Sequence, residues 1–512
     1  MTLRTETANT TWIAVHLPFI ELEAFVPCWE HALPSSAVVV LKQNRVIAMS
    51  STAALAGVRL GMRRGGVQML LPEVQFLHQD STRETAALSA AALALLRYTP
   101  QVSIAEDASI VLDIGASIRL FGGLAALRRQ IRATLRALGY STTIGCAPTA
   151  KAAWLFARNA AQGGRQGQSC LRSTHLSSAI DRLSVHLLMA SAQYQEFLQG
   201  LACHRLSDLR ALPRAGLQRR CGKGLLAELD LAYSLTSPPH IWVVADHEFI
   251  AKTELPDRTD NTDTLFVYSR SLLTQLLGWL NAHQLAVKHV HLELHHERGR
   301  QAVPPSLLDI HLAVATWQEA NLLPLFKEKI AHLQLSAAVI SLSLRAPETL
   351  PRAQSSDSLF PETVMNPADL QHLLTLLVAR LGADQVLLPC FQEDHRPEFA
   401  NQWVSVMTTS MASRPSALSM PSLPQSLPLR PTWLLVQAIA LEVRRHKPYF
   451  GSELTLISPA ERIEAGWWSD QTQVRDYFVA ISKEDVRYWI YRERASPTDL
   501  AEPLWFLHGI FG

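Results

Sequence analysis

Three segments in the N-terminal third each join an apolar strand pattern to the start of a helix, and they restrict the possible folds more than any other feature. The first, WIAVHLPFIELEAF, is an apolar run that ends at Pro18 and leads into a helix-like stretch. Another, TTIGCAPTAKAAWLFAR, predicts strand, turn and helix, with the boundary at Ala147-Pro148. We therefore expect a helix-covered sheet whose buried strands deliver residues to a site at their ends.

The segment between these two, QVSIAEDASIVLDIGASIRLFGG, contains two apolar runs separated by residues 105–108. This pattern predicts a hairpin that leads into a helix, which we expect to begin at Ser117. Asp113 closes the second run, and we interpret it as a turn residue at the end of the strand.

In their order and motifs, the three segments resemble the palm of the Y-family translesion DNA polymerases. Further matches cover essentially the whole chain: RLGADQVLLP, RPTWLL at 430–435, ERIEAGWW at 461–468, RDYFVA at 475–480 and the terminal WFLHGIFG. The last four lie beyond an ordinary Y-family polymerase and are similar to the polymerase-like subunit of a bacterial mutagenesis cassette. The resemblance implies an α+β multidomain fold with palm, fingers, thumb and little finger, plus a tethered small β-rich C-terminal module.

The positions at which this family binds two metal ions hold no carboxylate here. Two-metal phosphoryl transfer requires several carboxylates around two Mg²⁺ ions about 3.5–4 Å apart. By resemblance, the family's Asp-x-Asp falls on His16 and Pro18, and its Asp-Glu pair falls on Ala108 and Ser109. An imidazole is a poor Mg²⁺ ligand and a proline side chain is none. We therefore expect a polymerase fold that is not an enzyme and that uses no metal or other cofactor.

The groups that hold the incoming nucleotide are also missing. The segment SSTAALAGVRLGM resembles the fingers motif, whose Tyr and Arg fall on Ser51 and Ala54, and the family's palm Lys falls on Trp154. Loss of the Arg and Lys removes charge-assisted contacts to the triphosphate. Lys151 lies nearby, and we interpret it as a solvated helix residue. Because the metal and nucleotide positions are lost together, the sequence indicates a lost function.

Two alternatives remain open. The first is an active Y-family polymerase with a displaced metal site, in which Glu106 and Asp107 are a shifted remnant of the missing pair. Moving the acidic pair by about two residues leaves its side chains on the same face of the strand only if the hairpin keeps its length. The second is a DNA-binding damage sensor without clamp or polymerase partners.

Length and composition limit the number of domains and the kinds of partner and site that we expect. A chain of 512 residues that is 48% hydrophobic can bury several cores, and its net charge of +2 means that DNA contacts must come from local basic patches. The six cysteines show no Cys-x-x-Cys spacing, so neither a zinc site nor a disulfide framework is indicated. We find no signal-peptide pattern or long apolar run, and we expect a cytoplasmic protein with no membrane association and reduced thiols.

The resemblance and the composition shifts together predict the domain boundaries. We expect a palm at 1–165 with fingers inserted at about 36–80, a helix-hairpin-helix thumb at 166–240, a little finger at 241–350, a clamp-binding linker at 351–362, a helix-strand segment at 363–412, a Pro/Ser tether at 413–431 and the C-terminal module at 432–512.

The predicted thumb contains short helices, with leucines at helical spacing up to Leu212 and a break at Pro213. In the thumb that it resembles, backbone amides and basic side chains bind phosphates. The resemblance implies DNA contacts from Arg214, Arg219, Arg220 and Lys223. The alternative is a solvated basic helix face.

In the predicted little finger, two strand-like runs, VKHVHLELHHERG and AAVISLSLRAP, accompany two helical patterns. Strand alternation places His289, His291, Glu293 and His295 on one face, about 6.6 Å apart along the strand. Neighbours at this spacing cannot all converge on one ion, so a metal site would need ligands from a second strand. We expect exposed sheet histidines and no metal.

The linker contains a short segment, Ser356, Asp357, Ser358, Leu359 and Phe360, that resembles the pentapeptide with which polymerases of this group dock on the sliding clamp. The Gln expected at its head is replaced by serine, and Gln354 lies two residues too early. A plain linker with two apolar residues therefore remains open.

Residues 432–512 are rich in aromatic side chains, and the alternation in RDYFVAIS and RYWIYRER predicts antiparallel strands that are half-buried on one face. We expect most of the aromatics to form a core, although interfaces are enriched in the same residue types.

The resemblance implies four partners: DNA, the sliding clamp, a RecA-like accessory protein and an error-prone C-family DNA polymerase. It implies a non-catalytic scaffold that recruits this polymerase for DNA damage-induced mutagenesis and translesion synthesis.

Overall fold

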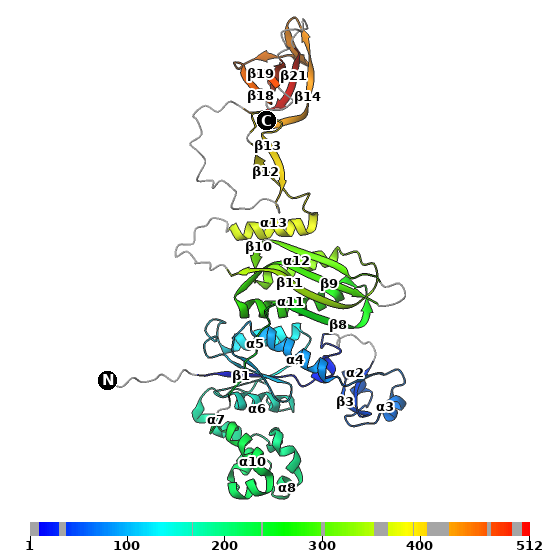
Figure 1. Ribbon diagram of the computed structural model, residues 1–512, viewed down its shortest axis with the longest axis vertical. Helices are drawn as coiled ribbons and strands as arrows, with labels where there is room; N and C mark the ends of the chain where they lie inside the picture. The colour runs from blue at the N-terminus through cyan, green and yellow to red at the C-terminus, as the bar shows by residue number, and fades with distance from the viewer. Residues whose placement is uncertain are drawn as a thin grey trace, which may run out of the picture. The chain divides into compact units, whose positions relative to one another are not determined.

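The computed structural model describes residues 10–29, 37–165, 167–236, 239–297, 303–352, 367–392, 394–406, 430–467, 473–493 and 504–511. The chain forms two compact units, Met1–Leu376 and Leu377–Gly512 (Figure 1). Helices and strands alternate in the first unit, whereas strands predominate in the second. This distribution agrees with the predicted α+β class.

A four-stranded antiparallel sheet, here called the palm sheet, has the strand order β5-β6-β1-β7. Its strands are β1 (Trp12–His16), β5 (Val102–Ala105), β6 (Ser109–Asp113) and β7 (Thr143–Ala147). Alternate residues of β1 enter two apolar cores. Ile13 and Val15 pack with helices α4 (Ser81–Leu95) and α5 (Leu124–Ala137), whereas Trp12 and Ala14 pack with α6 (Ala150–Ala161). The sheet is therefore covered by helices on both faces.

The strands and helices predicted for the three N-terminal segments are present, with one exception. The helix expected after the hairpin is present, but its predicted start at Ser117 is wrong, because α5 begins at Leu124. The intervening residues form turns, and the φ angles of Gly122 and Gly123 are 75° and 98°, outside the range of a right-handed helix. Asp113 is a turn residue as expected, since its Oδ1 accepts a hydrogen bond from the Gly115 amide at 3.0 Å.

A small three-stranded sheet, in the order β3-β2-β4, occupies the predicted fingers region. Strand β2 (Val38–Lys42) pairs antiparallel with β3 (Arg45–Met49) and parallel with β4 (Gln75–His78). Helices α2 (Ser51–Leu55) and α3 (Arg64–Leu70) pack on this sheet around Val67 and other apolar residues, and the short helix α1 (Ile20–Glu23) follows β1. This part has an apolar core of its own.

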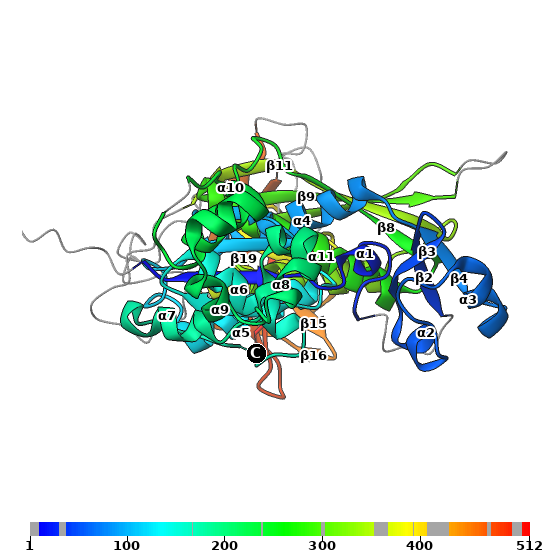
Figure 2. The same cartoon turned by 90° about the horizontal axis from the view of Figure 1, so that it is seen from below.

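Short helices follow the palm sheet, as predicted, and Figure 2 shows them grouped together in the view from below. They are α7 (Ser173–Asp181), the 3-10 helices Val185–Leu187 and Met189–Tyr194, α8 (Gln195–Gly200), α9 (Leu206–Ala211) and α10 (Arg214–Ala232). Helix α9 ends before Pro213, where the sequence predicts a break. Helix α10 is interrupted at Gly222, whose φ of 69° and ψ of −177° are essentially restricted to glycine.

A second four-stranded sheet, here called the little-finger sheet, has the order β10-β9-β11-β8. Its elements are β8 (Ile250–Thr259), α11 (Thr262–His283), β9 (Leu285–His296), β10 (Ser306–Thr316), α12 (Glu319–Ala331) and β11 (Val339–Pro351). The sequence patterns predicted only β9, β11 and the two helices. The missed strands, β8 and β10, lie at the two edges of the sheet, where fewer side chains are buried and the apolar pattern is weaker.

In the second unit, a hairpin of β12 (Leu387–Phe391) and β13 (Asn401–Ser405) precedes the C-terminal module, and α13 (Pro367–Leu381) spans the boundary between the units. The module is an eight-stranded sheet in the order β16-β15-β14-β21-β20-β19-β17, with β18 paired to β19. Its strands are β14 (Trp433–Arg444), β15 (Lys447–Phe450), β16 (Ser452–Glu453), β17 (Thr455–Leu456), β18 (Glu461–Ala465), β19 (Gln473–Ile481), β20 (Arg487–Glu493) and β21 (Trp505–Ile510).

The antiparallel pairing predicted for β19 and β20 is confirmed, but the expected burial on one face is wrong. Neighbouring residues of β19 enter two separate apolar clusters, Ala480 with Ile490 on one side and Tyr477 with Trp489 on the other. Both faces of β19 therefore contribute to apolar clusters of the module.

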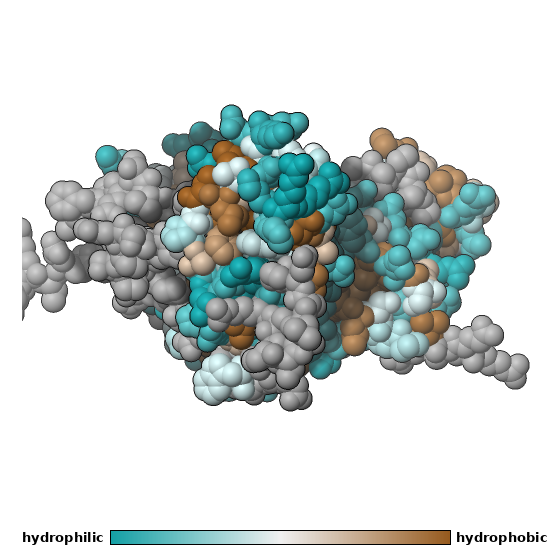
Figure 3. Space-filling model, turned by 90° about the horizontal axis from the view of Figure 1, so that it is seen from above, coloured by the Kyte–Doolittle hydropathy of each residue, from teal (hydrophilic) through white to brown (hydrophobic). Residues whose placement is uncertain are grey.

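Most described aromatics of the module form its core, as expected; Tyr477, Trp489, Tyr491 and Trp505 are buried. Trp433, Phe450 and Trp467 are exceptions, with exposed fractions of 69%, 37% and 77%. Figure 3 shows apolar surface interspersed with hydrophilic surface in the view from above.

Among the described residues, none of the helices has the length and apolarity that crossing a bilayer requires.

Candidate functional site in the palm

The four positions where the family would carry metal-binding carboxylates come together at one end of the palm sheet. His16, the last residue of β1, pairs with Ser109, the first residue of β6. The amide of Leu17 donates a hydrogen bond to the carbonyl oxygen of Ala108 at 3.0 Å. Pro18 follows in the turn after β1. The structure thus brings the four predicted positions together, and their assignment as former metal positions stays a prediction.

His16 is turned into the protein and is only 8% exposed. Its Nδ1 lies 2.8 Å from the carbonyl oxygen of Asp107 and 3.1 Å from Oγ of Ser109, which itself donates to the same carbonyl at 2.9 Å. Because a carbonyl oxygen only accepts, Nδ1 must carry a proton and donate. Burial lowers the pKa of His16. The imidazole is thus a neutral donor to the β5–β6 turn, with Nδ1 unavailable to a metal.

Trp154, which we expect at the position of the family's nucleotide-binding lysine, is 2% exposed. Its Nε1 donates a hydrogen bond to the carbonyl oxygen of Glu106 at 3.1 Å. The Lys151 ammonium lies 3.6 Å from the centroid of the indole ring, and Cζ of the Arg158 guanidinium lies 4.6 Å from it. Two cations therefore stack on one buried aromatic ring.

The two acidic residues beside the missing pair are both engaged by these cations. Oε2 of Glu106 lies 3.6 Å from Nζ of Lys151, and Oδ2 of Asp107 lies 2.6 Å from Nε of Arg158. A carboxylate that neutralises a neighbouring cation attracts Mg²⁺ less strongly than a free one. In the described parts of the chain, three metal-binding side chains converge in only one place, which is on the little-finger sheet.

Lys151 is not a solvated helix residue, so that interpretation is wrong. Its side chain is 15% exposed, and Nζ lies 2.7 Å from Oε1 of Glu228 on α10. Glu228 also accepts hydrogen bonds from the amides of Met189 and Ala190 at 3.1 and 2.9 Å. A buried carboxylate thus connects the palm helix α6 to the helical region that follows.

The local sequence explains why α6 presents these side chains to the hairpin turn. Gly145 in β7 allows α6 to approach closely, because a Cβ at this position would lie 2.2 Å from the carbonyl oxygen of Ala153. Residues 151, 154 and 158 are three and four apart and share one face of the helix. This spacing could have identified Arg158 from the sequence. Nothing in the local pattern identifies Glu228, because it lies on a distant helix.

The other predicted site residues are placed as follows. Ser51 and Ala54 lie on α2 and are exposed. The four basic residues of the predicted thumb are exposed on α10, namely Arg214, Arg219, Arg220 and Lys223. Arg214 forms two hydrogen bonds to the carboxylate of Asp230, at 2.9 and 2.7 Å. The segment Ser356–Phe360 lies outside the described residues, so the clamp-binding prediction stays a prediction.

Comparison with known proteins agrees with the resemblance seen in the sequence. Residues 23–158 match the model of the impB/mucB/samB family. Two curated relatives named Protein ImuB, from Caulobacter vibrioides strains NA1000 / CB15N and ATCC 19089, are each 25% identical over 476 residues, covering 89% of this chain and 100% of theirs.

Solved Y-family structures are also similar. A ternary complex of Dbh is 16% identical, covers 65% of this chain and 98% of its own, and gives a TM-score of 0.36. The DinB crystal structure from Sulfolobus solfataricus is 15% identical, covers 67% and 100%, and gives a TM-score of 0.35. The family match and the curated relatives confirm the predicted similarity: the chain is ImuB-like over most of its length, with a Y-family polymerase-like segment and a β-rich C-terminal module.

Proposed function

We propose that this ImuB-like chain is a non-catalytic Y-family polymerase homologue that binds DNA and the sliding clamp and recruits an error-prone polymerase for damage-induced mutagenesis and translesion synthesis. The observation that carries the proposal is the packing of Trp154 against the hairpin turn, with Glu106 and Asp107 each paired to a cation. A site that binds two Mg²⁺ ions needs free carboxylates at this place.

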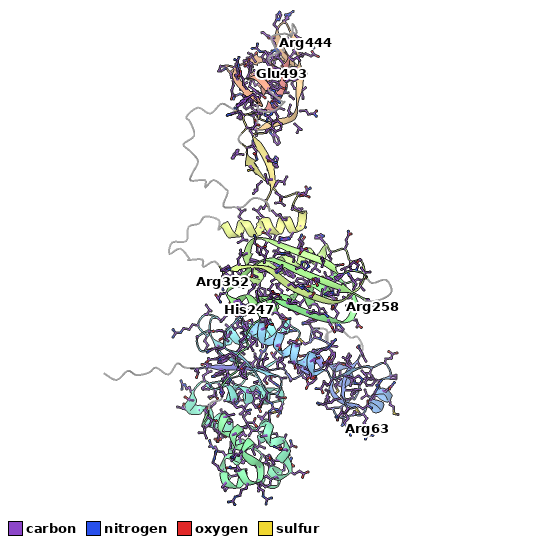
Figure 4. The ribbon with its side chains drawn as sticks, viewed as in Figure 1. Arg63, His247, Arg258, Arg352, Arg444 and Glu493 are labelled. Atoms are coloured by element: carbon purple, nitrogen blue, oxygen red, sulfur yellow. The ribbon has the colours of Figure 1, made fainter. Side chains whose placement is uncertain are left out.

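The basic residues on α10 support DNA binding. Arg219, Arg220 and Lys223 are exposed close to the break at Gly222, where two helical segments meet. Exposed cations at such a break can reach phosphates together with backbone amides of the second segment. Figure 4 labels Arg258 at one end of the little-finger sheet; Glu297 pairs with this cation at 3.1 Å, so it supports DNA binding less than the residues of α10 do. With a net charge of only +2, the chain would bind DNA weakly and without sequence preference.

The clamp contact and the protein partners rest on the sequence resemblance. We propose that Leu359 and Phe360 insert into a groove of the sliding clamp, and that the chain joins a RecA-like accessory protein of the ImuA type and an error-prone C-family DNA polymerase. Several weak contacts linked in one chain raise the effective concentration of the active polymerase at a stalled primer end.

The decisive experiment compares primer extension and DNA binding on the same primer-template. The purified chain is given all four nucleotides with Mg²⁺ or Mn²⁺, beside the double variant Glu106→Ala/Asp107→Ala. We expect DNA binding without extension by either protein. Extension by the unaltered chain that the double change abolishes would overturn the proposal and establish an active polymerase with a displaced metal site.

Clamp binding is tested separately by surface plasmon resonance on the immobilised cognate clamp. We expect Leu359→Ala with Phe360→Ala to weaken binding at least tenfold, since an apolar pair anchors such a peptide. The matched control changes the next apolar pair, Val364→Ala with Met365→Ala, and should leave binding intact. If both double variants bind like the unaltered chain, the pentapeptide is not the docking segment and the damage-sensor alternative gains support.

A further inference from the structure

The open face of the little-finger sheet carries a second cluster of polar side chains, separate from the palm. Helix α11 packs against β8, β9 and β11, and α12 packs against β10, so both helices cover the same face. Val290, Leu292 and Leu294 of β9 are buried on that side. The alternate residues of β9, including His289 and His291, therefore point to the face opposite α11 and α12.

The second strand that a metal site would require is present. In the antiparallel register of β9 and β10, Asp309 lies opposite His291, and His311 lies opposite His289. Oδ1 of Asp309 is 2.9 Å from Nε2 of His289 and 2.7 Å from Nδ1 of His291. One ligand atom from each of these three residues lies within 4.8 Å of the other two. Side chains spaced along one strand cannot converge on one metal ion, but side chains from two paired strands can.

We propose that His289, His291 and Asp309 bind one Zn²⁺ ion through three protein ligands, with a fourth coordination position open to solvent. Zn–N and Zn–O bonds of about 2.0–2.2 Å place tetrahedral ligand atoms about 3.3 Å apart. The two separations from Oδ1 of Asp309, 2.9 and 2.7 Å, need to widen by only about half an ångström to reach this geometry. Two imidazoles and one carboxylate suit Zn²⁺, whereas Mg²⁺ and Ca²⁺ prefer ligand sets made of oxygen.

The surroundings of the three ligands fit a bound ion. Oε1 of Glu293 lies 3.7 Å from Nε2 of His291, the ring nitrogen that stays free when Nδ1 binds the metal. Carboxylates beside that nitrogen orient metal-binding histidines. The ring of His311 stacks on that of His289, with 4.0 Å between the centroids, and restrains its rotation. The Asp309 side chain is 46% exposed, so an ion can enter from solvent.

The test is isothermal titration calorimetry of Zn²⁺ into the full-length chain, stripped of metal by a chelator and kept reduced at neutral pH. We expect one Zn²⁺ per chain with a dissociation constant in the micromolar range or tighter. Asp309→Asn and His291→Ala should each weaken binding at least tenfold. The matched control is His295→Ala, which removes a histidine on the same face that bonds instead to Ser343 at 3.0 Å.

Two further measurements separate this site from other causes of zinc binding. Asp309→Asn keeps the side-chain size, and its thermal unfolding without metal should match that of the unaltered chain. The Co²⁺-loaded protein should show no thiolate-to-metal absorption band, because the ligands are nitrogen and oxygen. No binding at micromolar Zn²⁺, equal binding by Asp309→Asn, or a thiolate band would each overturn the proposal and leave the three side chains as a hydrogen-bonded cluster only.

Discussion

The Lys151 ammonium lies 2.7 Å from the Glu228 carboxylate and joins α6 of the palm to α10 of the following helical region. Their side chains are 15% and 10% exposed, so water screens the pair only partly. The same carboxylate accepts two backbone hydrogen bonds from residues 189 and 190. This buried ion pair is thus a structural connection between two parts of the chain.

Lys151→Met should lower the free energy of unfolding by about 1–3 kcal/mol, because it leaves Glu228 buried without its cation. Urea unfolding measures the change, and a cycle with Glu228→Gln isolates the pair itself. The control is Arg214→Met, which breaks an exposed pair with Asp230 and should change stability little. Equal effects of the two substitutions would contradict the role given to Lys151.

Substitutions of Trp154 should separate its packing from its hydrogen bond. Trp154→Ala removes a buried ring on which two cations stack and should cost about 3–5 kcal/mol. Trp154→Phe keeps an aromatic ring but leaves the Glu106 carbonyl without its donor, and should cost about 1–3 kcal/mol. Chemical unfolding of both variants tests the order. A larger loss for the Phe variant than for the Ala variant would show that the ring does not carry the stability.

The break in α10 depends on a backbone conformation at Gly222 that other residues avoid. Gly222→Ala should lower the unfolding free energy by about 1–3 kcal/mol through strain, because an added Cβ meets nothing closer than the Tyr194 hydroxyl at 3.8 Å. Gly216→Ala is the matched control on the same helix and should stabilise by up to about 1 kcal/mol. Thermal unfolding distinguishes them, and opposite signs are the expected result.

DNA binding should depend on the free cations on α10. Arg219→Ala, Arg220→Ala and Lys223→Ala should each weaken binding at low salt and reduce the slope of log K against log salt by about 1. Arg214→Ala should have a smaller effect, since Asp230 already holds its guanidinium. Fluorescence anisotropy over a series of salt concentrations measures the slope. An unchanged slope in all four variants would place the DNA contacts elsewhere.

Stability of the first unit should fall as pH rises, because of Glu23. This carboxyl is 3% exposed, and burial raises its pKa from 4.5 to about 7, although it accepts a hydrogen bond from the Ser141 amide at 2.8 Å. The folded state then binds the proton more tightly than the unfolded state, so stability decreases between pH 4.5 and 7 and stays lower above that range.

Glu23→Gln removes the free-energy cost of burying an ionised carboxylate. It should stabilise the protein at pH 8 by up to about 3 kcal/mol, with little difference near pH 4.5. Denaturant unfolding at several pH values measures the difference between the two proteins. The exposed Glu73→Gln serves as the control and should leave the pH dependence unchanged. A constant difference between Glu23→Gln and the unaltered chain across the pH range would contradict the assignment.

The identities of His16, Pro18, Ala108 and Ser109, none of which carries a carboxylate, follow from the sequence directly. The sequence also determined the buried central strands and most helices, whose apolar periodicity is local. It missed β8 and β10, since edge strands bury too few side chains to show a clear pattern.

Which side chains meet depends instead on how distant parts of the chain pack together. The contact of Lys151 with Glu228 joins two helices that are distant in sequence, and the contact of Asp309 with His291 depends on strand register. Neither contact can be predicted from the local periodicity of apolar residues. That periodicity indicates which face of a strand or helix a residue occupies, but not which residue of another element it contacts. Residue types at single positions can be recognised in the sequence, whereas the contacts between distant positions are set by packing.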